Sequence, residues 1–234
     1  MADTSDRETE IQIKHTVATV LGCLEKGIVI ASAFIPLIGI ITPIVGAVKK
    51  TLVEDNKIKM LEKEFQQIHD KLESISQQTE QMLDQIQLSE IEINYGQAEN
   101  SIKFQYQAFQ NMMDHIRKDP EDSEHYREEF KKIYRNQKGL KNLNVYYDAI
   151  MEDQGPFGQP LLKFYQNNCK RNKKIMEARC AHLSYLFYIG LIAEMAYKEV
   201  IEDDQEMIRK EWGQKLIDIQ TKMQEALDEC NEKE

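Results

Sequence analysis

The chain has 234 residues, of which 41% are hydrophobic and 30% are charged, a balance typical of a folded helical protein with a large solvated surface. Its net charge of −10 argues against nucleic-acid binding, which needs a basic face, and gives no overall attraction to anionic lipid. The 10 glycines and 5 prolines are too few for a turn-rich all-β chain, and the 4 cysteines form no C-x-x-C metal or redox motif.

The first residues are acidic, whereas a secretory signal peptide begins with basic residues that lead directly into an apolar stretch. We therefore predict no signal peptide, and a protein that is cytoplasmic or secreted without a leader, with membrane association as a further state. Such a setting favours free thiols over a Cys169–Cys180 disulfide. Ser5 and Glu8 fit a capping box that opens a first helix, which extends to about Lys26.

An uncharged segment of 22 residues follows at 27–48, with the sequence GIVIASAFIPLIGIITPIVGAV. Its length suffices to span a bilayer, which takes about 20 apolar residues. Pro36 and Pro43 disfavour one straight helix and favour two short limbs that form a hairpin. Lys26, Lys49 and Lys50 flank the segment and are candidates for contact with lipid headgroups. The candidate membrane-inserting residues are Ile28, Val29, Ile30, Phe34, Ile35, Pro36, Leu37, Ile38, Ile40, Ile41, Pro43, Ile44 and Val45.

Three interpretations of this segment remain open. It is a hairpin buried permanently in the core, a concealed hairpin that is released on oligomerisation, or a constitutive membrane anchor. The two prolines and the acidic remainder of the chain disfavour the anchor. Small residues such as Gly39 and Gly46 allow close helix contact in a membrane and suit a releasable hairpin.

From Lys50 to Lys118 the pattern predicts one long helix that resembles a coiled coil. Apolar positions alternate in steps of three and four, with a register slip near Gly96, and Asp119–Pro120 ends the helix. A rod of that length measures on the order of 100 Å, so the molecule is elongated or the helix breaks near Gly96. The two seams are Ile58, Leu61, Phe65, Ile68, Leu72, Ile75, Thr79, Met82, Ile86, Ser89 and Ile93, then Ile102, Tyr106, Phe109, Met113 and Ile116.

The C-terminal half predicts further helices. Two short helices at 123–137 and 140–151 precede a loop at 154–160, and long helices fill 161–232. The first of these extends to about Ile201 and contains a charge-free run, 180–193, which is too short to span a bilayer and is expected to be buried. After a break at 202–204, the last helix uses Ile208, Trp212, Leu216, Ile219, Met223 and Leu227. We expect an all-α, elongated helical bundle of one domain, 1–234, with the apolar hairpin at one end.

Several stretches resemble the vertebrate Rapunzel family. These are Leu143–Tyr147, Gly155–Leu162, Ile175–Cys180 and Leu186–Leu191, followed by the acidic triplet 202–204 and Trp212. The resemblance covers nearly the whole chain and implies a family associated with skeletal and fin growth, without an agreed biochemical activity. An apolar segment between long amphipathic helices is also similar, in architecture alone, to cytolysin-A-type helical pore-forming proteins.

Few residues carry recognisable chemistry. Because no phosphate-binding, nucleophile or metal-ligand motif occurs, we expect no enzyme activity, no cofactor and no metal site. His182 lies within the apolar run and is a candidate pH sensor, although a hydrogen-bonded core histidine is the more common case. The basic residues Lys170, Arg171, Lys173 and Lys174 form a solvated face or contact lipid phosphate.

These features favour a membrane-active helical bundle with pore-forming capacity. In this hypothesis the hairpin is released on homo-oligomerisation, lipid is a conditional partner and nucleic acid is not a partner. The alternative is a soluble coiled-coil adaptor of the Rapunzel family that has a developmental role and does not insert into membranes.

Overall fold

The computed structural model describes residues 85–152 and 155–230, together with individual positions between 11 and 77, and this part of the chain is all-α. Helix α4 spans Gln85–Lys118, and the 3-10 turn η1, Pro120–Asp122, leads into α5, Ser123–Asn136. The remaining helices are α6 (Lys141–Met151), α7 (Leu161–Asn168), α8 (Lys173–Val200) and α9 (Gln205–Asp228). The predicted helical bundle is confirmed.

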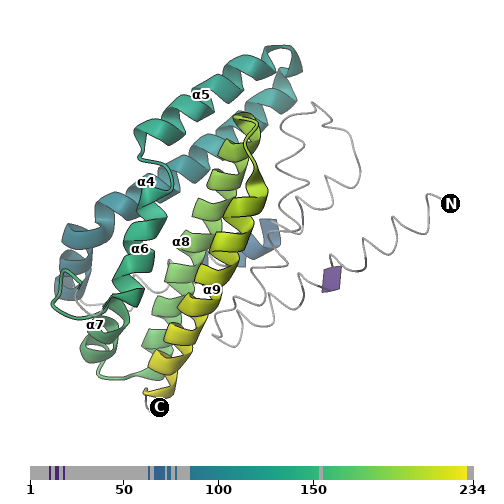
Figure 1. Ribbon diagram of the computed structural model, residues 1–234. Helices are drawn as coiled ribbons and strands as arrows, with labels where there is room; N and C mark the ends of the chain where they lie inside the picture. The colour runs from purple at the N-terminus through teal and green to yellow at the C-terminus, as the bar shows by residue number, and fades with distance from the viewer. Residues whose placement is uncertain are drawn as a thin grey trace.

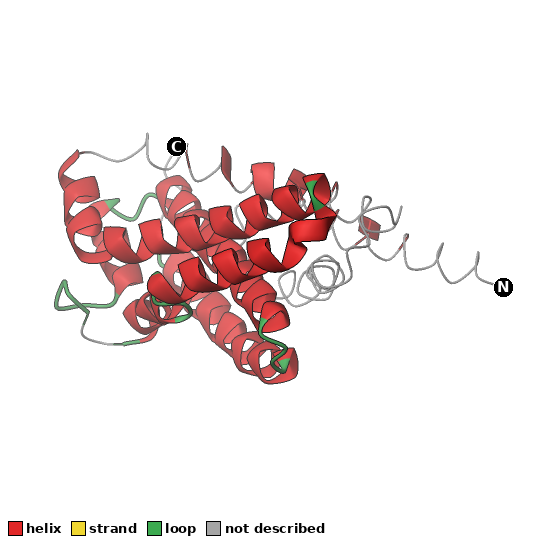
Figure 2. Cartoon of the chain, turned by 90° about the horizontal axis from the view of Figure 1, so that it is seen from above, coloured by secondary structure: helices red, strands yellow, loops and turns green. Residues whose placement is uncertain are grey.

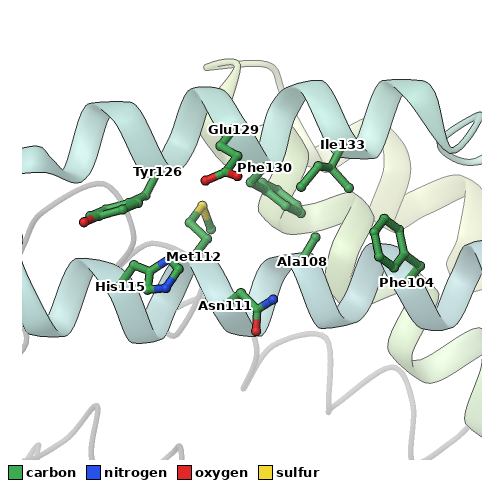
Figure 3. A pocket seen from close by; sticks show the side chains of 9 residues that line it. All are labelled: Phe104, Ala108, Asn111, Met112, His115, Tyr126, Glu129, Phe130 and Ile133. Carbon is green, nitrogen blue, oxygen red and sulfur yellow. The ribbon is translucent and has the colours of Figure 1, made fainter.

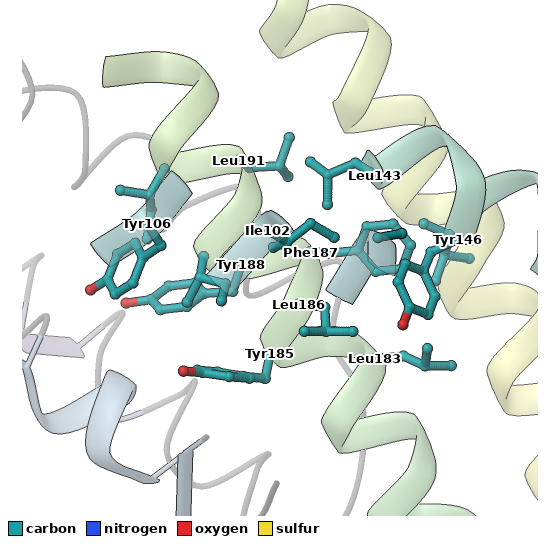
Figure 4. Packing of buried hydrophobic residues seen from close by; sticks show 14 of the residues in the cluster. Ile102, Tyr106, Leu143, Tyr146, Leu183, Tyr185, Leu186, Phe187, Tyr188 and Leu191 are labelled. Atoms are coloured by element: carbon teal, nitrogen blue, oxygen red, sulfur yellow. The ribbon is translucent and has the colours of Figure 1, made fainter. Parts of the chain in front are cut away.

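Helix α8 is the central element of the bundle. It contacts α4, α5, α6, α7 and α9 (Figures 1 and 2). Every residue from Arg179 to Ala196 is buried, so the charge-free run 180–193 is the enclosed helix segment that its length predicted. Figure 4 shows its leucines and aromatic rings packed against Ile102 of α4 and Leu143 of α6. Each such side chain stabilises the fold by about 1.5–3 kcal/mol through burial.

The buried stripe of α4 follows one register along the helix. It confirms the predicted second seam but contradicts the slip near Gly96, because the helix continues through Gly96 and the stripe already begins at Ile91. Ile93, assigned to the first seam, is 82% exposed. The buried positions at this spacing are Ile91, Tyr95, Ala98, Ile102, Tyr106, Phe109, Met113 and Ile116, and Ser101, Gln105, Ala108 and Met112 beside them are buried too.

The prediction of one continuous helix from Lys50 to Lys118 is wrong. The ring centroids of His69 and Tyr106 lie 5.2 Å apart, and those of His69 and Tyr185 lie 5.7 Å apart. On a straight helix the 37 residues from 69 to 106 would cover about 55 Å. The residues around His69 therefore pack beside α4 and do not continue it in a straight line. The heptad pattern indicated an apolar face on each segment but not the direction of the chain.

The predicted helix from Leu161 to Ile201 is two helices. Lys170 (φ 50°) and Arg171 (φ 59°) adopt left-handed backbone conformations that end α7. The side chain of Asn172 then caps α8 by accepting a hydrogen bond of 3.2 Å from the backbone N–H of Ile175.

The other C-terminal boundaries agree with the sequence. The helices predicted at 123–137 and 140–151 are α5 and α6, and residues 155–160 form the described part of the predicted loop. Asp204 caps α9 through a 2.8 Å hydrogen bond from the backbone N–H of Glu206, as the break at 202–204 indicated. All six apolar positions predicted for the last helix are buried.

Candidate functional site

The predicted site residues are distributed unevenly over the described structure. The segment 27–48, with all its candidate inserting residues, lies outside the described residues, as do the flanking lysines at 26, 49 and 50. Lys170 and Arg171 lie in the α7–α8 turn and, like Lys174, are exposed, whereas Lys173 is half-buried. His182 is buried in α8, eight residues beyond Lys174. The structure therefore does not join His182 and the basic residues into one site.

A partly buried polar cluster surrounds His182, and we name it the Glu99 cluster. It consists of Glu99 and Lys103 of α4, Tyr146 of α6 and His182 of α8. His182 Nε2 lies 3.2 Å from Glu99 Oε2, and the Tyr146 hydroxyl donates a 3.2 Å hydrogen bond to the same oxygen. Lys103 Nζ lies 2.7 Å from the other carboxylate oxygen. One carboxylate therefore ties together three helices.

The Glu99 cluster favours an ionised carboxylate. Burial acts to raise the pKa of Glu99, but the hydrogen bond and charge of His182, together with Lys103, outweigh it and hold that pKa well below its usual range. A lowered pKa stabilises the fold above the usual carboxyl pKa near 4.5, and this contribution is lost only as pH falls through the lowered value. The cluster therefore persists through mild acid.

This geometry changes the interpretation of His182 as a pH sensor. The sequence placed the imidazole in purely apolar surroundings, where protonation would loosen the packing. Its Nε2 instead faces the Glu99 carboxylate, so a protonated ring forms an ion pair and not an uncompensated buried charge. The sensor role stays a prediction, but loosening by simple burial of charge no longer explains it.

A fully buried carboxyl group lies near the other end of α8. Glu194 is 3% exposed and accepts a short hydrogen bond from the Tyr134 hydroxyl of α5. Burial raises the pKa of Glu194, against the opposing effects of the Tyr134 hydrogen bond and the charge of Lys198. Beside it, the rings of Tyr134 and Tyr197 stack at 4.6 Å, and Arg135 Nε donates a 2.7 Å hydrogen bond to the Tyr197 hydroxyl. Polar contacts thus fasten α5 to α8.

Sequence reasoning missed Glu99, Tyr146 and Glu194. A signal was present for both acids: Glu194 follows the charge-free run directly, and Glu99 falls on the apolar face of α4, between Tyr95 and Ile102. Their partners could not be found in this way. The His182–Glu99 and Tyr134–Glu194 pairs are separated by 83 and 60 residues in the chain.

Two features are absent from the described residues. No group of three or more His, Cys, Asp or Glu side chains among them is arranged to hold a metal ion. None of the helices in the described part of the chain has the length and apolarity needed to cross a membrane. Cys169 and Cys180 are free thiols, which agrees with the state that the sequence favoured.

Comparisons with known proteins find a matching family model and a similar curated protein. A family model described as a cephalotoxin-like middle helical domain matches residues 52–234. The chain is also similar to protein rapunzel of the zebrafish Danio rerio, with 31% identity over 230 residues that cover 98% of this chain and 100% of the relative. No solved structure matches the chain. The family match begins four residues after the uncharged segment 27–48 ends.

Proposed function

The chain belongs to the Rapunzel family and carries a cephalotoxin-like middle helical domain, and on this basis we propose that it is a membrane-active helical-bundle protein with pore-forming capacity. In this proposal the segment 27–48 inserts into lipid when the protein oligomerises. The helices α4–α9 are the scaffold that carries the segment. The observation that carries the proposal is an uncharged, proline-interrupted run directly before a domain whose family description names a toxin.

The packing of the described bundle supports the role of a scaffold. Helix α8 contacts α4, α5, α6, α7 and α9, and these helices share one hydrophobic core, to which Ile68 also contributes. The Glu99 cluster and the Glu194–Tyr134 pair add hydrogen bonds from α8 to α4 and to α5, and Tyr146 of α6 donates to the same Glu99 carboxylate that faces His182. A bundle held in this way can release a flanking hairpin without losing its fold.

The electrostatics favour a trigger other than unfolding in acid. The low pKa of Glu99 keeps the α4–α6–α8 connection intact at endosomal pH, as argued above. The net charge of −10 gives no general attraction to anionic lipid, which leaves apolar contact or self-association as the driving force. The exposed cations Lys170, Arg171 and Lys174 add a local contact for lipid phosphate.

Vesicle flotation and dye leakage with the full chain, at micromolar concentration and from pH 5 to 7.5, test the proposal. We expect binding and leakage by the wild type and loss of both in the double variant Ile38→Asp/Ile41→Asp, because charges oppose insertion. Met207→Asp is the matched control: Met207 is 70% exposed on α9, so this variant should remain active.

The same experiment separates the adaptor function from the proposed one. Light scattering of the soluble protein and of detergent extracts from vesicles reports whether subunits assemble at the membrane. A chain that neither floats with nor permeabilises vesicles at any of these pH values, while remaining a stable monomer or dimer, would contradict membrane activity and favour the adaptor.

A further inference from the structure

A small hollow lies between α4 and α5 (Figure 3). Its volume is about 90 Å³, enough for a small organic group but not for a whole lipid or a peptide. Side chains of both helices of the α4–α5 hairpin line it. No residue of the Glu99 cluster takes part, so the hollow is separate from the polar contacts around α8.

The walls of the hollow are mainly aromatic and apolar. Met112 and Phe130 form its buried floor, with 2% and 1% of their surfaces exposed. His115 and Tyr126 close one end, with ring centroids 4.9 Å apart, and Phe104 stands at the other end, half exposed to solvent. Aromatic faces carry negative electrostatic potential and attract cations.

A carboxylate lies at the solvent-exposed rim of the hollow, on Glu129. The side chain of Glu129 extends from α5 toward α4 and Met112 in Figure 3. Within the described part of the chain it has neither a hydrogen-bond donor nor an ion-pair partner, although most neighbouring acids on α5 do. Desolvation raises the pKa of Tyr126, and the nearby charges of Asp119, Asp122 and Glu129 raise it further, so three carboxylates act on this end of the hollow.

The lining selects among cations. A calcium ion needs about six to eight oxygen ligands, far more than the Glu129 carboxylate and the Asn111 amide supply. A primary ammonium group has three N–H donors, and only the Glu129 carboxylate, the Asn111 amide and the His115 ring in this lining can accept from it, whereas the other six lining side chains are apolar or aromatic. A quaternary ammonium group has no N–H to satisfy and is bound by aromatic faces together with one negative charge.

We propose that this hollow binds a quaternary ammonium group, the chemistry of a choline headgroup. Phe104 at the open end would lie against the apolar part of a choline lipid just beyond its headgroup. This inference goes beyond the proposed membrane activity and does not rest on it, because the hollow involves no residue of the segment 27–48.

Calorimetric titration of the full chain with tetramethylammonium chloride tests the site, with ammonium chloride at the same ionic strength as the reference. We expect binding of the quaternary ion alone, weakened by about fivefold or more in Glu129→Gln and in Tyr126→Leu. Glu128→Gln is the matched control, because Glu128 pairs with Lys131 at 2.5 Å outside the hollow, and its affinity should stay that of the wild type. Equal responses to both ions, or an unaffected Glu129→Gln variant, would overturn the proposal.

A second experiment distinguishes a soluble choline compound from a choline lipid as the source of the quaternary ammonium group. Vesicles of phosphatidylcholine and of phosphatidylethanolamine are floated with the wild type and with Glu129→Gln, with and without phosphocholine as a competitor. Preference for phosphatidylcholine that disappears with Glu129→Gln or with phosphocholine supports the lipid headgroup. Binding of tetramethylammonium and phosphocholine without this preference supports a soluble choline compound. Leakage without any tetramethylammonium binding would leave the membrane activity in place and remove this site.

Discussion

Gly190 and Gly213 both lie inside long helices, and changing each to alanine separates two effects that a helical glycine combines. Alanine is the better helix former, by roughly 0.5–1 kcal/mol, wherever its methyl group has room. At Gly213 in α9 a Cβ atom would have no neighbour within 4 Å, so Gly213→Ala should stabilise the fold by about that amount.

At Gly190 the methyl group would enter the contact between α8 and α6. Its Cβ would lie 2.6 Å from Leu143 Cδ2 and 2.9 Å from Cγ, whereas carbon atoms in good contact lie about 3.5–4.0 Å apart. Leu143 is 1% exposed and cannot turn out of the way, so the helices must separate or the side chain must leave its rotamer. Overpacking of this kind costs about 1–3 kcal/mol, and that cost is the expected stability difference between the two alanine variants.

Denaturant unfolding followed by circular dichroism measures both variants under identical conditions. A third variant tests the assigned cause: Leu143→Ala alone should cost about 2–5 kcal/mol, and in its presence Gly190→Ala should stabilise the fold by about 0.5–1 kcal/mol, as at Gly213. If Gly190→Ala were as stable as Gly213→Ala, or if Leu143→Ala did not relieve it, the close α6–α8 contact would not be the reason for the glycine.

Three further substitutions test the polar contacts and the helix cap. Glu194→Gln should be more stable than the wild type at pH 8, because a raised carboxyl pKa means that stability falls as pH rises through it; unfolding midpoints that differ equally at pH 4 and pH 8 would contradict this. Glu99→Gln should cost about 2 kcal/mol at pH 7 through its lost charge-assisted bonds to His182, and a much smaller penalty in thermal unfolding would remove the structural role of the cluster. Asn172→Ala should cost about 1 kcal/mol and speed amide exchange at Ile175, whereas unchanged exchange there would exclude the cap.

Local chemistry explains why much of the C-terminal half could be predicted. Proline at position 120, the Gly- and Pro-rich loop and the acidic triplet 202–204 each end a helix through short-range effects that the sequence displays directly. The apolar positions of α9 repeat at helical spacing, and all six proved buried. The α7–α8 break escaped because Lys170 and Arg171 are neither glycine nor proline, yet both adopt left-handed conformations that the surrounding contacts impose.

Local sequence patterns could not predict where the chain reverses direction or which polar side chains meet. Heptad spacing marks an apolar face but does not say whether successive segments continue or fold back, so the segment around His69 and α4 were read as one rod. The partners in the Glu99 cluster could not be predicted from local patterns either. An acid on an apolar face signals a buried partner, but the identity of His182, 83 residues away, depends on how α8 crosses α4.

Glu99, Glu194 and Gly190 together define how α8 is held. Apolar packing alone allows helices to slide or rotate by small amounts, but hydrogen bonds to a carboxylate are lost when their partners move. His182 and Glu194 are 12 residues apart, about 18 Å along α8, and they fix its position against α4 and α6 at one level and α5 at another. Gly190 lies between those levels and sets the close distance to α6. Such a helix is poorly suited to leave the bundle, although it is the most apolar helix described. The proposed function therefore assigns insertion into lipid to the uncharged segment 27–48 and not to α8, because insertion of α8 would break these contacts.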